Sequence, residues 1–235
     1  TKKGIRIMSN TKFIDNGPEE TLQDRFALRI KNTQSFDVLS GYFYSSGFKA
    51  IYPSLENTKK IRILVGISTD YKTLEAVKSA KELSSTEKEK EVRKEYASSV
   101  KKELEEAEDS LETEESVSKF KEWVISERIE IRAYPDQKIH SKVYIMTADE
   151  QTKSFTKGTV ITGSSNFTES GLRGNIEFNV ELKDEADYDY ALGQFEELWK
   201  KGVPISDQYV QTINHETWLN DRVTPYELYL KFLYE

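Results

Sequence analysis

His140, Ser141 and Lys142 lie in a run of strand composition from Ile139 to Met146. Side chains alternate between the two faces of a strand, so we expect His140 and Lys142 on one face and Ser141 on the other. An ammonium group disfavours a positive charge on a neighbouring imidazole, and this favours a neutral, nucleophilic ring. The pair therefore predicts a histidine nucleophile with a cation beside it, although a single histidine on a strand is more often structural.

A second group of polar residues follows at the end of a predicted strand over residues 158–163. The sequence from Thr162 to Thr168 is typical of a strand that turns into a short helix, from Asn166 to Leu172. Hydroxyl, amide and helix-start N–H groups at the end of a strand can bind an anion. The loop from Gly171 to Asn175 then leads to Glu177, which we expect to begin the next strand.

In this order and spacing, the residues resemble the signature of the phospholipase D superfamily. That signature is His-x-Lys, four residues, Asp, and then Gly-Ser-x-Asn. The matching positions are His140, Lys142, Gly163, Ser164 and Asn166. Asn175 and Glu177 resemble the Asn-x-Glu element of the compact bacterial nucleases in this superfamily, and the resemblance extends over about residues 36–200.

The resemblance implies a two-step reaction at a phosphodiester. His140 would attack phosphorus to form a phosphohistidine. A second His140 would protonate the leaving oxygen and then activate water. Lys142 and Asn166 would stabilise charge on the phosphoryl oxygens, and Ser164 would hold the phosphate or the imidazole. Glu177 would accept the other ring N–H of a histidine and thereby fix its tautomer.

Further residues of the same segments are expected to contact the substrate. These residues are Gly163, Ser165, Arg173 and Asn175. The scheme uses no cofactor and no metal. The chain has no Cys and only two His, which excludes cysteine-ligated metal sites and a three-histidine site within one chain.

The sequence departs from the signature at one position and contains the motif only once. Thr147 stands where the motif has Asp, and Asp149 follows two residues later. A chain with a single motif can obtain the second by forming a homodimer about a two-fold axis, and we expect one here. His215 has no Lys two residues on, so we expect a structural role for it.

The wider pattern predicts an α/β protein, a layered α/β/α sandwich with a mixed, phospholipase D-like sheet. A helix follows Asp15-Asn16-Gly17-Pro18, with Pro18 in its first turn and Leu22, Phe26 and Ile30 on one face. The expected strands cover residues 36–43, 61–67, 128–134, 139–146, 158–163 and 177–182. A further helix begins at Asp184, which makes the alternation typical of layered α/β folds.

We divide the chain into a phospholipase D-like domain, 1–204, and a C-terminal helical segment, 205–235. Residues 71–127 are expected to be a charged helical insertion that projects from the body as a hairpin or arm and has few core contacts. Between Lys81 and Ser118 there are 13 acidic and 7 basic residues, which is −6 of the total charge of −7. The rest of the chain is near neutral and can therefore carry a local basic site.

These features favour a metal-independent phosphodiesterase or nuclease that acts on nucleic acid. No apolar stretch is long enough to span a membrane and no signal peptide opens the chain, so we expect a cytoplasmic protein without a membrane partner. Gly41-Tyr-Phe, Leu64-Val-Gly and Pro225-Tyr-Glu-Leu-Tyr resemble the phospholipase D-like domain ahead of bacterial Swi2/Snf2-type helicases. An apolar run that continues to Glu235 also suggests a fragment of a longer polypeptide, and in that setting DNA is the expected substrate.

A second hypothesis belongs to a different class. Because Thr147 replaces the motif Asp, the domain could be catalytically silent and serve to bind DNA or to dimerise the helicase. Cleavage of a generic phosphodiester would distinguish the two hypotheses.

Overall fold

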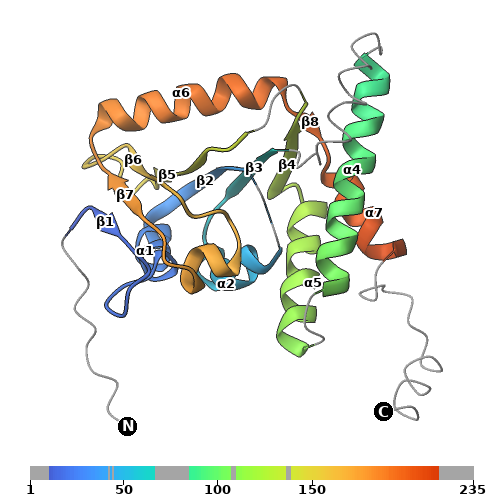
Figure 1. Cartoon of the computed structure of the whole chain (residues 1–235). Coiled ribbons are helices and arrows are strands. Elements are labelled where there is room, and N and C mark those ends of the chain that lie inside the picture. Colours follow the sequence, from blue (N-terminus) through green and yellow to red (C-terminus); the bar gives the residue numbers. More distant parts are fainter. Residues whose placement is uncertain are drawn as a thin grey trace.

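The computed structural model describes residues 11–41, 43, 45–66, 85–106, 110–135 and 139–216. Within these ranges the chain forms an eight-stranded mixed sheet with helices on both faces (Figure 1). The strands are β1 (Phe13–Ile14), β2 (Thr33–Ser40), β3 (Lys60–Gly66), β4 (Ile129–Tyr134), β5 (Lys142–Ala148), β6 (Gly158–Gly163), β7 (Asn179–Leu182) and β8 (Val203–Pro204). The helices are α1 (Leu22–Arg29), α2 (Ser45–Leu55), α4 (Ser85–Glu106), α5 (Leu111–Ile125), α6 (Glu185–Lys201) and α7 (Ser206–Glu216).

The sheet has the order β1-β7-β6-β5-β2-β3-β4-β8. β2 runs parallel to β3, and β3 runs parallel to β4, whereas β5 runs antiparallel to β2 and to β6. The carboxyl ends of β2, β3 and β6 therefore lie at the same edge of the sheet as the starts of β5 and β7. This edge collects the residues that the motif singled out.

Two apolar clusters separate the layers. One cluster joins α6, through Phe195 and Trp199, to one face of the sheet, including Ile145 and Val160. The other cluster covers the opposite face with residues from α1, α2, α4, α5 and α7. Figure 1 shows α6 alone above the sheet, with α1 and α2 below it. The layered α/β/α architecture expected from the sequence is confirmed.

The first helix begins later than expected. α1 begins at Leu22, so Pro18 lies outside it, and Thr21 caps the helix by accepting a hydrogen bond from the Asp24 backbone N–H. Asn16 adopts a positive φ of 58°, and its side-chain Oδ1 accepts from the Leu22 N–H at 2.7 Å. The turn therefore satisfies the first orphan donors of the helix with side chains instead of with proline.

A buried ion network joins α1 to β7. The Arg25 guanidinium donates to Glu181 and to Glu20, with Nη1–Oε2 and Nε–Oε1 distances of 2.6 Å each. Arg29 also pairs with Glu181. Arg25, Glu20 and Glu181 are all buried. Removal of one of these charges would therefore leave part of the opposite charge uncompensated in the interior.

The described part of the charged insertion, α4 and α5, packs into the molecular core, which corrects the expectation of a projecting arm. Val92, Tyr96 and Val100 on α4 are buried in the same apolar cluster as the sheet. Phe120 on α5 is fully buried, and its ring meets that of Phe48 on α2 at a centroid distance of 4.8 Å. Glu87, Glu89, Lys90 and Lys94 of α4 are exposed, while its thin apolar stripe packs inward.

The C-terminal helical segment begins with α7, which packs against α4 and α5 (Figure 1). The expected apolar run up to Glu235, with its Pro225 motif, lies outside the described residues, as does Tyr42 of the Gly41-Tyr-Phe element. Among the helices that the structure describes, none combines the length and the hydropathy needed to cross a bilayer.

Candidate active site

The histidine of the motif lies just outside the strand in which it was expected. β5 begins at Lys142, so His140 and Ser141 belong to the loop before it. His140 is exposed, while the Lys142 side chain is only 6% exposed and its Nζ lies 3.1 Å from His140 Nδ1. Lys142 Nζ also donates to the His140 carbonyl oxygen at 2.8 Å. Lys142 therefore contacts both the ring and the backbone of His140. The two side chains lie together, as the His-x-Lys spacing predicted, although His140 is outside the strand.

This contact determines which ring nitrogen carries the proton. An ammonium group has donors but no lone pair, so Nδ1 of His140 must accept the hydrogen bond. In the neutral ring the proton then resides on Nε2. His140 in this geometry presents Nε2–H, on the ring nitrogen that Lys142 does not contact, as a hydrogen-bond donor.

Two glycines at the strand ends make room for the histidine loop. A Cβ on Gly41 would lie 2.8 Å from the Ile139 carbonyl oxygen and 3.6 Å from His140 Cα. A Cβ on Gly66 would lie 2.8 Å from the same carbonyl oxygen. The loop that carries His140 can therefore pass directly over the ends of β2 and β3 only because both positions lack a side chain.

Asn166 lies beside this loop. Its Oδ1 is 3.7 Å from the position that a Gly41 Cβ would take, close to the backbone of His140. Ser40 pairs with Lys142 across β2 and β5, and its hydroxyl lies 3.4 Å from Asn166 Oδ1. The Ser40 hydroxyl also accepts from the Phe167 N–H at 3.2 Å. Ser40 thus positions Asn166 next to the His140–Lys142 pair.

Ser164, Asn175 and Glu177 form a polar cluster on the adjacent loop. The Ser164 hydroxyl donates to the Glu177 carboxylate and accepts from the Phe178 N–H at 2.9 Å. Asn175 Nδ2 donates to Glu177 Oε1 at 3.4 Å. In the part of the chain that the structure describes, the side-chain hydrogen bonds of this carboxylate are therefore with Ser164 and Asn175 and not with a histidine ring. Glu177 precedes β7, which begins at Asn179 and not at Glu177.

The remaining motif residues fall into different environments. Ser165 is fully buried, and its hydroxyl accepts from Asn179 Nδ2 at 2.9 Å, so it positions the loop and is not accessible to a substrate. A Cβ on Gly163 would lie 2.3 Å from the Phe178 carbonyl oxygen, which makes glycine a packing requirement at the end of β6. Arg173 is exposed on a π-helical turn (Ser170–Gly174), where the short helix was expected, and it is paired with Glu169.

A buried tyrosine links the two loops and was not identified from the sequence. The Tyr144 hydroxyl donates to the Ser165 carbonyl oxygen at 2.6 Å. Burial raises the pKa of Tyr144, the negative charge of Glu177 raises it further, and a hydrogen bond with Ser40 offsets only part of this shift. Tyr144 therefore remains a neutral donor and anchors the loop from the interior.

The position of the missing motif Asp lies on the other face of the sheet. Thr147 Oγ1 lies 2.9 Å from the hydroxyl of Tyr188, which belongs to α6. Lys142 shares its face with Tyr144, whose ring is in the opposite apolar cluster. Asp149 accepts backbone and side-chain hydrogen bonds from Thr152 in the turn after β5. Neither Thr147 nor Asp149 contributes a group to the cluster around His140.

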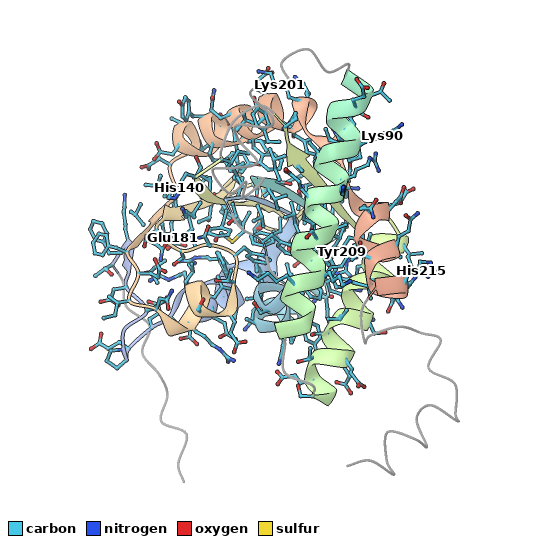
Figure 2. All side chains as sticks on the ribbon, turned by 45° about the vertical axis from the view of Figure 1, so that its right-hand side comes forward. Lys90, His140, Glu181, Lys201, Tyr209 and His215 are labelled. Carbon is cyan, nitrogen blue, oxygen red and sulfur yellow. The ribbon has the colours of Figure 1, made fainter. Side chains whose placement is uncertain are left out.

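The second histidine belongs to another part of the molecule. His215 is exposed on α7, and Figure 2 shows it well separated from His140. Over the described ranges, no group of three or more His, Asp or Glu side chains could hold a metal ion.

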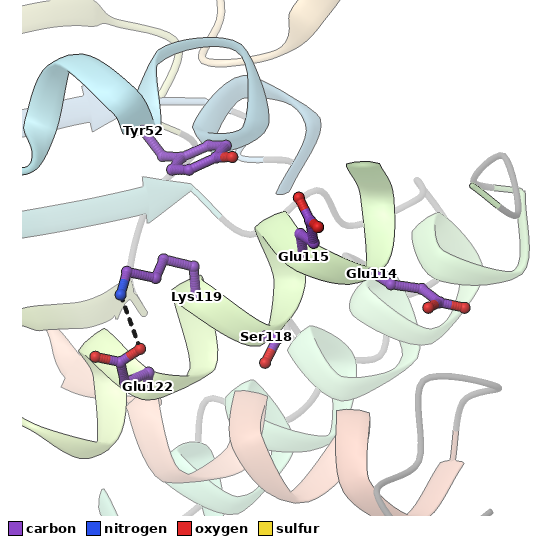
Figure 3. Close-up of a pocket in the computed structure, with 6 residues that line it drawn as sticks. All are labelled: Tyr52, Glu114, Glu115, Ser118, Lys119 and Glu122. Atoms are coloured by element: carbon purple, nitrogen blue, oxygen red, sulfur yellow. Dashed lines mark hydrogen bonds and ion pairs between the residues drawn. The ribbon is translucent and has the colours of Figure 1, made fainter. Parts of the chain in front are cut away.

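An open hollow between α2 and α5 is lined by Tyr52, Glu114, Glu115, Ser118, Lys119 and Glu122 (Figure 3). It shares no residue with the histidine cluster.

Comparison with known proteins identifies related sequences and folds. Residues 28–199 match the family model described as "Cardiolipin synthase, PLD-like domain". Nuc from Salmonella typhimurium, described as a phospholipase D family member, is 15% identical with a TM-score of 0.46 over 82% of this chain and 95% of that chain. NucT from Helicobacter pylori is 11% identical, with a TM-score of 0.44 over 78% and 90% of the two chains.

Phosphatidylserine synthase from Haemophilus influenzae is 12% identical, with a TM-score of 0.47 over 94% of this chain and 43% of that chain. No curated protein sequence matches this chain.

Proposed function

The chain belongs to the PLD-like domain family, and from this premise we propose that it is a phosphodiesterase that cleaves nucleic acid through His140. The observation that carries the proposal is the contact of Lys142 Nζ with His140 Nδ1 at a sheet edge that also holds Asn166. An exposed imidazole with a buried cation beneath it combines a nucleophile with a group that can stabilise a phosphoryl oxygen.

The first chemical step forms one bond and breaks another at phosphorus. Nε2 of His140 attacks, a P–N bond forms, and the P–O bond to the leaving group breaks. His140 of a second copy, as an imidazolium, gives its Nε2 proton to the leaving oxygen and becomes neutral. As an imidazolium this second ring is protonated at both nitrogens, so its Nδ1 cannot at the same time accept the hydrogen bond from Lys142.

The second step reverses the roles. The second His140 removes a proton from water, the water oxygen attacks phosphorus, and the P–N bond breaks. The attacking histidine must present an unprotonated Nε2, so its Nδ1–H needs an acceptor other than Lys142. Glu177, held by Ser164, is the carboxylate that we assign to this task. Every group in the scheme belongs to the protein, and no step is assigned to a metal ion.

The choice of nucleic acid over lipid is part of the proposal. A fold alone does not select a substrate, and the matching family model carries the name of a lipid enzyme. The Asn175-x-Glu177 element, which resembles that of compact bacterial nucleases, favours nucleic acid. A helicase setting, a homodimer and DNA as the substrate belong to the same proposal; the C-terminal residues that suggested the helicase lie outside the described residues.

A catalytically silent DNA-binding or dimerisation module is the second candidate function, because Thr147 replaces an Asp of the motif. The environment of Thr147 argues against this alternative, since its hydroxyl is bound to Tyr188 on the face of the sheet away from Lys142. A change on that face leaves the nucleophile and its cation in place.

Trapping of the covalent intermediate tests the proposal. The protein is mixed with a phosphodiester, quenched in base to preserve a phosphoramidate bond, digested and analysed by mass spectrometry. We expect a phosphoryl adduct on His140 and none on His215. An adduct on another residue, or turnover without any adduct at His140 in a single-turnover time course, would contradict the scheme.

A further inference from the structure

Three exposed apolar side chains surround Glu177 at the edge of the candidate active site. Phe13 is 55% exposed, Phe178 is 62% exposed and Ile176 is 98% exposed. The rings of Phe13 and Phe178 are stacked, with a centroid distance of 5.1 Å and an interplanar angle of 27°. We call these two residues the Phe13–Phe178 pair. Exposed aromatic rings that pack mainly on each other indicate a surface that receives a partner.

The pair is attached firmly to the active-site loop. The Phe178 N–H donates to the Ser164 hydroxyl at 2.9 Å, and the Ser164 N–H donates to the Phe178 carbonyl oxygen at 3.2 Å. Phe13 lies on the edge strand β1, where it pairs with Val180 of β7. Both rings are therefore held by backbone pairing next to the loop that carries Ser164 and Glu177, and their position is coupled to that of the site.

Cations lie farther along the same edge. Lys12 precedes Phe13 and is exposed, and its carbonyl oxygen accepts from the Glu181 N–H at 2.7 Å. Lys183, which follows β7, is about half exposed, with Nζ 3.4 Å from Glu181 Oε2. Aromatic faces next to the loop that carries Ser164, followed by ammonium groups along the edge, are the elements with which proteins bind single-stranded nucleic acid.

We propose that the Phe13–Phe178 pair is a stacking platform for an unpaired base of the nucleic acid whose phosphodiester is cleaved at His140. The inference rests on the proposed function and deepens it by naming the substrate class. A base in a duplex has both faces covered by its neighbours, whereas an unpaired base offers a free face to a phenyl ring. The platform therefore selects single strands, ends or flaps over continuous duplex.

Binding of two oligonucleotides tests the platform. All variants carry His140→Ala so that the probes stay intact, and affinities for labelled oligothymidylate and for an abasic oligonucleotide of the same length are measured by fluorescence anisotropy. The double substitution Phe13→Leu with Phe178→Leu keeps apolar side chains and removes the rings. Base stacking contributes enough that we expect a loss of about tenfold in affinity for oligothymidylate and no change for the abasic probe.

The matched control is Phe155→Leu. Phe155 is 89% exposed in the turn between β5 and β6, at the end of these strands away from the site, and its substitution should change neither affinity. Unchanged affinity of the double variant for oligothymidylate, or an equal loss for both probes, would overturn the platform. Conversion to a monomer by the double variant, or loss of binding to anionic vesicles in place of oligonucleotide, would assign the pair to a subunit interface or a lipid surface instead.

A parallel assay separates failure of the platform from failure of the proposed function. Protein with His140 intact is assayed with bis(p-nitrophenyl) phosphate, which has no base to stack. Cleavage of this substrate together with base-independent binding would refute the platform alone. Base-dependent binding without any cleavage would refute the proposed catalysis and leave the platform standing.

Discussion

Gly163 is the residue on which the spacing of the active-site loops depends most directly. A Cβ at this position would lie 2.3 Å from the Phe178 carbonyl oxygen and 2.5 Å from Asn179 Oδ1. Both atoms belong to the segment that holds Ser164 and Ser165 in place. Any side chain at residue 163 must therefore push β7 away from β6.

We expect Gly163→Ala to reduce the free energy of unfolding by about 1–3 kcal/mol, the usual cost of overpacking a fitted site. Gly193 provides the matched control, because a Cβ on this α6 residue would meet no atom within 4 Å. Gly193→Ala should stabilise the protein by about 0.5–1 kcal/mol, since alanine favours the helical backbone. Urea unfolding of the two variants measures both changes in the free energy of unfolding. If Gly163→Ala were no more destabilising than Gly193→Ala, β7 would be able to shift freely.

Glu181 gives the protein a defined response to acid. Burial by itself would raise the pKa of the Glu181 carboxyl, but the cations of Arg29, Lys183 and Arg25 outweigh burial and hold this pKa below its ordinary value of 4.5. A carboxyl whose pKa is lowered on folding contributes stability above its unfolded pKa and loses that stability as the pH falls through the folded pKa. The free energy of unfolding should therefore decline below about pH 4.5.

Replacement of this carboxylate isolates its contribution. Glu181→Gln removes one of the two carboxylates that pair with the buried Arg25 and should cost up to about 3–5 kcal/mol at neutral pH. The difference from the wild-type protein should shrink as the pH falls below the folded pKa of Glu181. Glu197→Gln, which breaks an exposed pair with Lys200 on α6, is the control and should cause no measurable change. If the difference in the free energy of unfolding between wild type and Glu181→Gln did not change with pH, Glu181 would not be the source of the response to acid.

At the scale of elements, α4 and α5 complete the core. Phe120 on α5 packs against Phe43, Phe48 and Tyr209, with ring centroids 4.8–5.5 Å apart. We expect Phe120→Ala to lower the free energy of unfolding by about 3–5 kcal/mol, because the vacated volume lies between α2, α5 and α7. Glu122→Ala, at an exposed position of the same helix, should have little effect in the same urea titration.

Deletion of the helices tests the same point more severely. A short Gly/Ser linker in place of residues 85–118 should give a protein without a cooperative unfolding transition, since it would remove the buried side chains of Val92, Tyr96, Val100 and Val117 from the main apolar cluster. A soluble, cooperatively folded deletion variant would restore the arm hypothesis.

Strong periodicity made several elements predictable. Residues 128–134 and 158–163 were expected to be strands, and β4 and β6 match these ranges to within a residue. The apolar stripe of α4 was visible in the sequence, but its spacing cannot show whether it faces a core, a partner or solvent. That decision depends on the position of α7, which lies far away along the chain.

In the candidate site, too, contacts within one motif could be predicted from the sequence, whereas contacts between distant segments could not. The His140–Lys142 contact was predictable because it depends on two residues of one motif. Ser40 and Tyr144 were not identified, and Gly66 was noted only as part of Leu64-Val-Gly, because the roles of these residues arise from strand neighbours that no local spacing encodes. Ser165 was expected to bind substrate, and only the fold reveals that its side chain points into the interior.

At the scale of the whole molecule, the proposed chemistry requires two copies. One chain supplies one His140, and His215 on α7 is too distant to act opposite it (Figure 2). Light scattering should give twice the chain mass of 27.2 kDa. A mixture of His140→Ala and Lys142→Ala proteins should not regain full activity, because every shared site would still lack one group. A fully active monomer would contradict the dimer.

The central claim is that His140 performs the chemistry without help from a metal ion. The most direct measurement is the rate of bis(p-nitrophenyl) phosphate cleavage in excess EDTA for the wild-type protein, His140→Ala and His215→Ala. Wild type and His215→Ala should cleave alike, while His140→Ala should lose at least about 100-fold in rate with an unchanged melting temperature, since its side chain is exposed. Activity that disappears with EDTA, or that survives His140→Ala, would contradict the account.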